Sequence, residues 1–273
     1  MNIIPLIFYP RSGSTAVDHI LTQHPLVNAI NEPYVSDRVS LTNQRLKLNP
    51  QKPKEVSLKD FMKPVVKALP KNKKIVCFQY CDLDIGYISE IYDIDIHANF
   101  IKNNFKNLII IRRKNILKQI ISYYKARYSK IWHKDNNQST EFKFKFTFNE
   151  CIMNSALNEG ESFNYYHNPI LPRGNNISSI YEYINVYEKD QKELLLKLQE
   201  YNVNYLDIIY EDHIENDPFV AIKMIENYIK IPHYDNYTIP LKKISKGIEY
   251  DITNYDEICR ELRNTKYEWM LDV

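Results

Sequence analysis

A short loop near the start of the chain combines residue types that bind anions. An apolar run over residues 2–9 leads directly into PRSGST at residues 10–15. Backbone N–H groups of such a loop and of a following helix converge on one point, where the helix dipole favours negative charge. Arg11 adds a fixed charge and Gly13 allows a close backbone approach. Hydroxyl donors come from Ser12, Ser14 and Thr15. The loop predicts a phosphate or sulfate site; the alternative is a turn that Ser and Thr merely cap.

The loop differs from that of an ATPase, which reads GxxxxGKS or GxxxxGKT. Gly13 and Thr15 match the last Gly and the hydroxyl residue, but Ser14 replaces the Lys and Phe8 replaces the first Gly. The missing Lys is the residue that reaches the β- and γ-phosphates of a nucleoside triphosphate. The loop therefore suits a phosphate or sulfate group rather than a triphosphate.

A second basic motif follows the most apolar strand expected in the chain, residues 107–112. Arg112 and Arg113 stand at its carboxyl end, and Ser122 follows on the next expected helix. Arginine binds phosphate bidentately. In a phosphate-loop NTPase this strand commonly ends in an Asp that helps to hold Mg²⁺. The arginines therefore predict a second anion site without a metal, and the spacing does not choose between them.

A carboxylate follows the next expected strand, at Glu32 in Asn31-Glu32-Pro33-Tyr34. Glu32 is the best candidate for a base that takes a proton from an attacking hydroxyl. The alternatives are a solvated loop residue or an ion-pair partner of Arg11. His24 is the rival base, although a His-Pro pair after a helix more often caps it.

In these motifs the sequence resembles the sulfotransferases that use 3′-phosphoadenosine 5′-phosphosulfate (PAPS). Residues 10–15 match the family's 5′-phosphosulfate loop, and RRxNxxxQxxS at 112–122 is similar to bacterial carbohydrate sulfotransferases of the trehalose 2-sulfotransferase type. Residues 210–218 resemble the family's YEDL…DP segment and residues 254–257 its NYDE element. The resemblance covers residues 1–35, 107–128 and 205–273.

The resemblance implies a set of roles. PAPS is the co-substrate, no metal is needed, and the acceptor is a hydroxyl of a small molecule or glycan. Arg11 neutralises the leaving phosphate, and Glu32 is the base. The 5′-phosphosulfate is bound by the loop residues Arg11, Ser12, Gly13, Ser14 and Thr15, and the 3′-phosphate by Arg112 or Arg113 with Ser122.

Strands that alternate with helices position these motifs. The pattern predicts an α/β fold of P-loop type, with a doubly wound, mostly parallel sheet whose ligands bind at the carboxyl ends of the strands. Strands are expected at 2–9, 26–30, 74–80, 107–112, 141–148 and 204–210. Helices are expected at 15–23, 58–69, 115–128, 177–201, 218–229 and 254–262. Asp217 and Pro218 read as the cap and first residue of one helix.

The composition is that of an ordinary globular chain of 273 residues with a net charge of +2. We expect one domain, with insertions at 36–73 and 129–180 that form an acceptor pocket and lid. The weak charge argues against nucleic acid as a partner. No apolar run is long enough for a membrane span, and we expect a cytoplasmic protein whose four cysteines are reduced thiols. Oligomeric state stays open.

Two rival functions remain. A phosphate-loop kinase or NTPase would need the missing Lys and an acidic strand end. A non-catalytic nucleotide-binding protein on the same fold would keep the anion sites and lose the base.

Overall fold

The computed structural model describes residues 2–30, 75–81, 94–129, 143–146, 179–239 and 247–272. The chain divides into two compact units. The first, here called the sheet unit, contains Met1–Arg112 and Leu194–Pro240. The second, the helical unit, contains Arg113–Glu193 and Leu241–Val273. The expectation of a single domain with two insertions stays a prediction.

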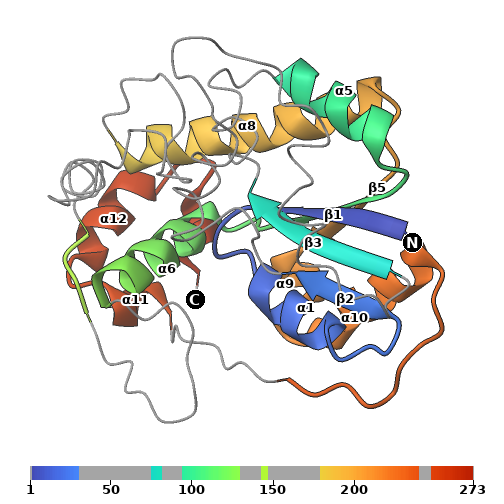
Figure 1. The fold of residues 1–273 in the computed structure, drawn as a ribbon. Coiled ribbons are helices and arrows are strands. Elements are labelled where there is room, and N and C mark those ends of the chain that lie inside the picture. The colour runs from blue at the N-terminus through green and yellow to red at the C-terminus, as the bar shows by residue number, and fades with distance from the viewer. Residues whose placement is uncertain are drawn as a thin grey trace, which may run out of the picture. The chain divides into compact units, whose positions relative to one another are not determined.

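Five parallel strands form the centre of the sheet unit, in the order β2-β3-β1-β4-β5 (Figure 1). The strands are β1 (Asn2–Phe8), β2 (Val27–Ile30), β3 (Ile75–Cys81), β4 (Leu108–Arg112) and β5 (Tyr205–Ile209). The predicted fold class, an α/β fold with a doubly wound parallel sheet and flanking helices, is confirmed.

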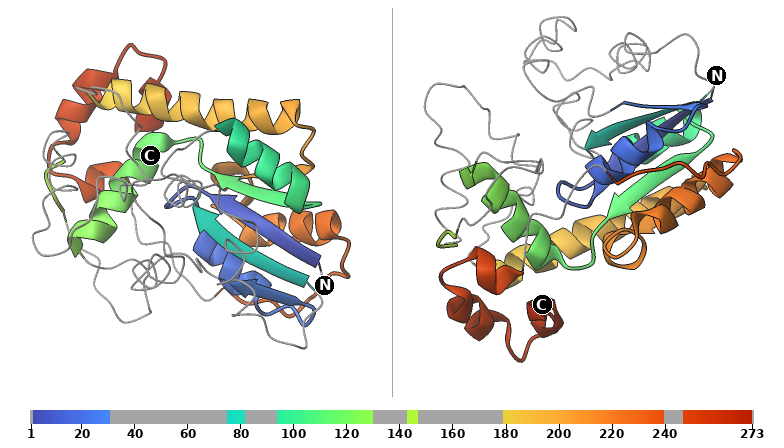
Figure 2. Two further views of the ribbon diagram at one scale, coloured as in Figure 1. Left: turned by 45° about the horizontal axis from the view of Figure 1, so that its top comes forward. Right: turned by 90° about the horizontal axis from the view of Figure 1, so that it is seen from below.

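Helices cover both faces of this sheet. α1 (Ser14–Leu21) and α10 (Pro218–Ile229) pack on one face, and α5 (Ile94–Asn104) lies on the other (Figures 1 and 2). Alternate residues of β1 enter the core under α1 and α10, while Ile7 is buried on the opposite face. Burial on both faces explains why β1 reads as a continuous apolar run instead of an alternating one.

The connections place the loop after β1 at a switch point of the sheet. The chain leaves β1 toward β2 on one side, and it leaves β4 toward β5 on the other. β1 and β4 are neighbours, and the Tyr9 N–H donates to the Ile111 carbonyl at 3.3 Å. In open α/β sheets, ligands bind in the crevice at such a point. The PRSGST loop and the Arg112 end of β4 therefore share the edge where a ligand is expected.

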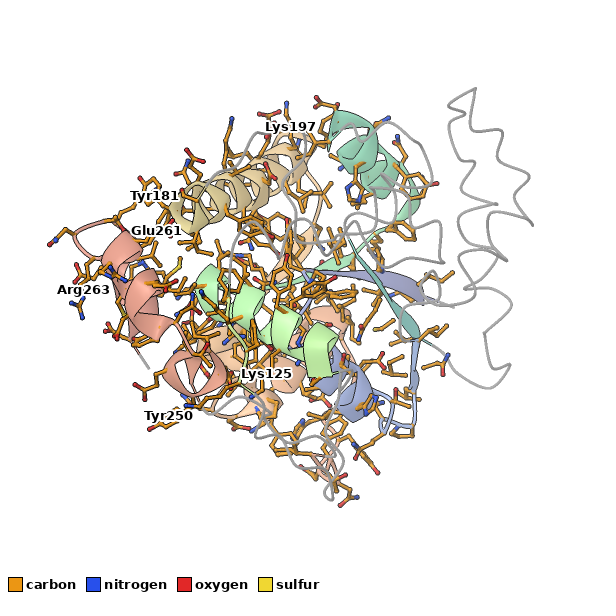
Figure 3. All side chains as sticks on the ribbon, turned by 90° about the vertical axis from the view of Figure 1, so that its left-hand side faces the viewer. Lys125, Tyr181, Lys197, Tyr250, Glu261 and Arg263 are labelled. Atoms are coloured by element: carbon orange, nitrogen blue, oxygen red, sulfur yellow. The ribbon has the colours of Figure 1, made fainter. Side chains whose placement is uncertain are left out.

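The helical unit is built from α6 (Ile116–Ser129), the first part of α8 (Ile180–Glu200), α11 (Ile248–Asp251), α12 (Tyr255–Leu262) and η2 (Glu268–Leu271). Figure 3 shows this unit with Lys125, Tyr181 and Glu261 labelled. Lys125 on α6 forms a buried ion pair with Asp251 at the end of α11. The Tyr181 N–H donates to Glu261 of α12 at 3.1 Å. Polar contacts therefore join the helices of this unit.

From Leu194 onward, α8 belongs to the sheet unit. Lys197 in this part pairs with Asp95 of α5 at 3.2 Å (Figure 3). None of the helices in the described ranges is long and apolar enough to cross a membrane.

Most predicted elements that fall on described residues are present, with ends shifted by a few residues. The exception is the strand expected at 141–148. Its described part, residues 143–146, forms only a β-bridge between Phe144 and Ile252. The helix expected at 58–69 lies outside the described residues. Four short or Asn-rich elements were not predicted: α5, α9 (Tyr210–His213), α11 and η2.

Candidate anion site

The loop after β1 opens with a tight turn from Tyr9 to Ser12. The Ser12 N–H donates to the Tyr9 carbonyl at 3.1 Å, with Pro10 and Arg11 between them. Arg11 has a φ of 66°, in the left-handed region. A turn with proline second and a left-handed third residue normally has glycine at that third place. A side chain there costs about 1–2 kcal/mol. Strain of this kind concentrates at functional sites.

Ser12 is fully buried, and its Oγ has no hydrogen-bond partner in the described part of the chain. A buried polar group without a partner costs about 1–3 kcal/mol. An oxygen of a bound phosphate or sulfate would accept the Ser12 hydroxyl hydrogen. The residues present therefore fit an oxyanion at this loop.

Gly13 is the N-cap of α1 and has a φ of 86°. No side-chain hydrogen bond caps the helix at this residue. The residue at the N-cap is therefore neither Ser nor Thr, and an uncapped helix start of this kind leaves N–H groups that can bind an anion. Glycine also has a packing role here. A Cβ at this position would lie 2.8 Å from Cδ2 of Tyr210, on α9.

Gln79 on β3 contacts the start of α1. Its Nε2 donates to the Ser14 carbonyl at 2.8 Å, and its side chain is buried. Ser14 is buried and Thr15 half-buried in the same helical turn. Sequence reasoning missed Gln79. The available signal was one amide in the apolar run Lys74–Tyr80.

Arg112 is bound to a neighbouring strand. Its Nε and an Nη donate to the two carboxylate oxygens of Asp207 on β5 at 2.8 and 2.7 Å. These hydrogen bonds outweigh the effect of partial burial and raise the pKa of Arg112 above its usual value. A bidentate pair of this geometry fixes the guanidinium plane. The structure therefore gives Arg112 a role in joining β4 to β5.

The rest of the second basic motif lies in the helical unit. Arg113 is buried, and Ser122 is half-buried on α6. Asn115 caps α6, because its Oδ1 accepts from the Lys118 N–H at 2.9 Å. Gln119 donates to the Tyr187 hydroxyl of α8 at 3.1 Å. Asn115 and Gln119 of the motif thus form structural hydrogen bonds within the helical unit.

The two candidate bases differ. Glu32 lies outside the described residues, so its role stays a prediction. His24 is buried, its Nδ1 accepts from the Leu26 N–H at 3.0 Å, and its Nε2 lies 3.1 Å from the Pro232 carbonyl. These contacts require the hydrogen on Nε2, and they join His24 to the residues that follow α1 and to Pro232, which follows α10.

The C-terminal motifs are structural. Asp217 accepts from the Phe219 N–H at 2.9 Å with Pro218 in the first turn of α10, which confirms the predicted cap. Asn254 binds the backbone of Phe146 on both sides, at 2.9 and 2.6 Å. The NYDE element therefore holds residues 143–146.

No group of His, Cys, Asp and Glu side chains that could hold a metal occurs in the described segments. Cys77 and Cys259 are buried free thiols.

No protein-family model matches the chain, and no curated protein matches it. Among solved structures, the chain is similar to the crystal structure of a sulfotransferase from Alicyclobacillus acidocaldarius. The identity is 10% and the TM-score 0.48, over 95% of this chain and 90% of that chain. Similarity at this level assigns neither a family nor an activity, so function must be argued from the residues of the site.

Proposed function

We propose that this protein is a sulfotransferase that moves a sulfuryl group from PAPS to a hydroxyl group. The acceptor that we propose first is a carbohydrate. One observation carries the proposal: the PRSGST loop forms a strained, uncapped turn at the switch point of the sheet, with the buried Ser12 hydroxyl unpaired among the described residues. The family resemblance of the sequence then identifies the anion as a 5′-phosphosulfate.

In this proposal the loop binds the 5′ end of the donor. Arg11 supplies charge, and the first N–H groups of α1 with Ser12, Ser14 and Thr15 supply donors. For the 3′-phosphate we propose Arg113 with Ser122; Arg112, which donates through Nε and one Nη to Asp207, is the alternative. The assignment of Arg113 and Ser122 rests on the sequence motif.

The reaction forms one S–O bond and breaks another. The acceptor oxygen attacks sulfur while the bond from sulfur to the bridging phosphate oxygen breaks, which releases adenosine 3′,5′-bisphosphate. Glu32 takes the proton from the acceptor hydroxyl. Arg11 stabilises the negative charge that develops on the leaving phosphate. The products are a sulfate ester and the bisphosphate.

The test is transfer of labelled sulfate from PAPS to a panel of glycans and small alcohols. We expect transfer to survive excess EDTA, because no part of the proposed mechanism uses a metal. Glu32→Gln should lower kcat about a hundredfold and leave binding of adenosine 3′,5′-bisphosphate intact. Arg11→Ala should weaken both turnover and binding.

Each rival has its own result. Magnesium-dependent ATP turnover would identify a kinase or NTPase. Tight binding of the bisphosphate without transfer to any acceptor would identify a non-catalytic nucleotide-binding protein. Wild-type turnover by Glu32→Gln across a range of pH would remove Glu32 as the base.

A further inference from the structure

Gln79 is an exception among its neighbours on β3. Ile75 and Cys77 share its face of the strand and enter the apolar core under α1 and α10. Gln79 is only 1% exposed in the same row. An amide in such a place needs hydrogen bonds to offset the loss of water. Its Nε2 has one, to the Ser14 carbonyl, whereas its Oε1 has no partner among the described residues.

We propose that Gln79 is a positioning residue for the anion site: it holds the first turn of α1 from β3 and so directs the N–H groups that meet the anion. The carbonyl it binds belongs to the peptide that joins Ser14 to Thr15. In a planar trans peptide the N–H points opposite to the carbonyl. A bond that fixes the Ser14 carbonyl therefore also fixes the Thr15 N–H, which points back toward the loop.

No side chain of the loop is seen to cap the first turn of α1 in the described residues. Arg11 and Gly13 both have left-handed backbones, and no side chain caps the helix at Gly13. Among the described residues, Gln79 is the one side chain that hydrogen-bonds the backbone of residues 13–16. The contact from β3 therefore supplies the side-chain hydrogen bond to the first turn of α1 that the loop itself does not supply.

The unpaired Oε1 of Gln79 allows an effect on the position of the helix to be distinguished from an effect on stability. A buried acceptor without a donor destabilises the fold, and an apolar side chain of similar shape removes that cost. The Ser14 carbonyl would keep its partner within the helix, since each helical carbonyl accepts from the N–H four residues later. Gln79→Met should therefore leave the stability of the free protein unchanged or higher. A residue kept only for packing would behave in the opposite way.

The test compares Gln79→Met with wild type in two measurements on the full chain. Calorimetric titration with inorganic pyrophosphate, and separately with adenosine 3′,5′-bisphosphate, gives Kd, and thermal unfolding without ligand gives Tm. We expect Kd to rise about tenfold for both ligands, with Tm equal or higher. Hydrogen exchange at the amides of residues 14–16 should be faster in the variant.

Two matched variants support the comparison. Gln79→Glu keeps the size but replaces the donor with a carboxylate, so Kd should rise further. The side chain of Ile75 lies on the same strand and face as Gln79 and makes no polar contact. Ile75→Val should therefore lower Tm and leave Kd unchanged.

A wild-type Kd in Gln79→Met would overturn the proposal. So would a lower Tm with an unchanged Kd, and so would a wild-type protein that binds neither ligand. The inference rests on the proposed function for the identity of the anion only. If wild type binds pyrophosphate and Gln79→Met binds it more weakly, Gln79 positions the site even when no sulfuryl transfer from PAPS is found.

Discussion

Arg11 and Gly13 occupy the two left-handed positions of the loop after β1 for different reasons. Arg11 carries a side chain where the backbone favours glycine, so the turn accepts strain to place a positive charge. Gly13 has the residue type that its backbone requires, and it also leaves space for the ring of Tyr210. The turn therefore depends on α9 for its shape as well as on its own sequence.

Gly13→Ala tests this dependence. A Cβ would add left-handed strain of about 1–2 kcal/mol and an overlap with Tyr210, and overpacking of this kind costs about 1–3 kcal/mol. We expect a loss of unfolding free energy of about 2–4 kcal/mol in urea denaturation, together with weaker pyrophosphate binding. In the Tyr210→Ala background the same substitution should cost less, because the overlap with the ring is removed and only the strain and a 3.2 Å contact with Cγ2 of Ile214 remain. Equal costs in the two backgrounds would show that the ring does not restrict residue 13.

At the level of elements, the carboxyl edge of the sheet holds Arg11, which we propose to bind the anion, and Arg112, which binds a neighbouring strand. Arg11 follows β1, whereas Arg112 at the end of β4 binds Asp207 of β5. The two strand ends are neighbours, because the Tyr9 N–H meets the Ile111 carbonyl. Arg11 and Arg112 both stand at the carboxyl end of a strand, yet Arg112 is bound to another strand and Arg11 lies in the proposed anion site.

Alanine substitutions at Arg112, Asp207 and Arg113 separate the structural ion pair from the proposed contact to the 3′-phosphate. Arg112→Ala and Asp207→Ala should each lower the unfolding free energy, and the double variant should lose less than the sum, with a coupling of about 1 kcal/mol for this partly exposed pair. Arg113→Ala should instead abolish the preference for adenosine 3′,5′-bisphosphate over adenosine 5′-monophosphate, measured by calorimetry. A normal preference in Arg113→Ala, with the preference lost in Arg112→Ala, would reverse the assignment.

The sequence predicted the elements that its periodicity marks clearly. β4 follows from an apolar run, and α10 follows from a capping Asp with a proline after it. Both are local signals. The loop at residues 10–15 was also found from a local signal, and its role as an anion site stays a prediction. The contacts of Gln79, Tyr210 and Asp207 are tertiary, and no spacing in the sequence joins them to their partners. α5 was missed because its polar Asn and His residues obscure the apolar face that packs on the sheet.

At the scale of the whole molecule, burial of weak acids occurs in both units. Burial, reinforced by the charge of Asp18, raises the pKa of the Cys77 thiol to about 12. Burial, together with a hydrogen bond to Glu226, raises the pKa of Tyr237 in the sheet unit. Burial also raises the pKa of Tyr255 and Tyr267 in the helical unit. Each of these groups is neutral in the folded protein at neutral pH.

The stability of the chain should therefore fall at alkaline pH. A group whose pKa is higher in the folded state contributes stability that is complete below its unfolded pKa and disappears as the pH rises through the folded value. For Cys77 this window runs from an unfolded value of about 8.5 to about 12. Each such group changes the unfolding free energy by up to about 1.4 kcal/mol per pH unit within its window. Urea denaturation at pH 8 and pH 10.5 measures the fall, and Cys77→Val should show a smaller fall than wild type. Comparing each protein with itself at the two pH values cancels the packing change at residue 77, so an equal fall in both proteins would exclude Cys77 as a source of the alkaline instability.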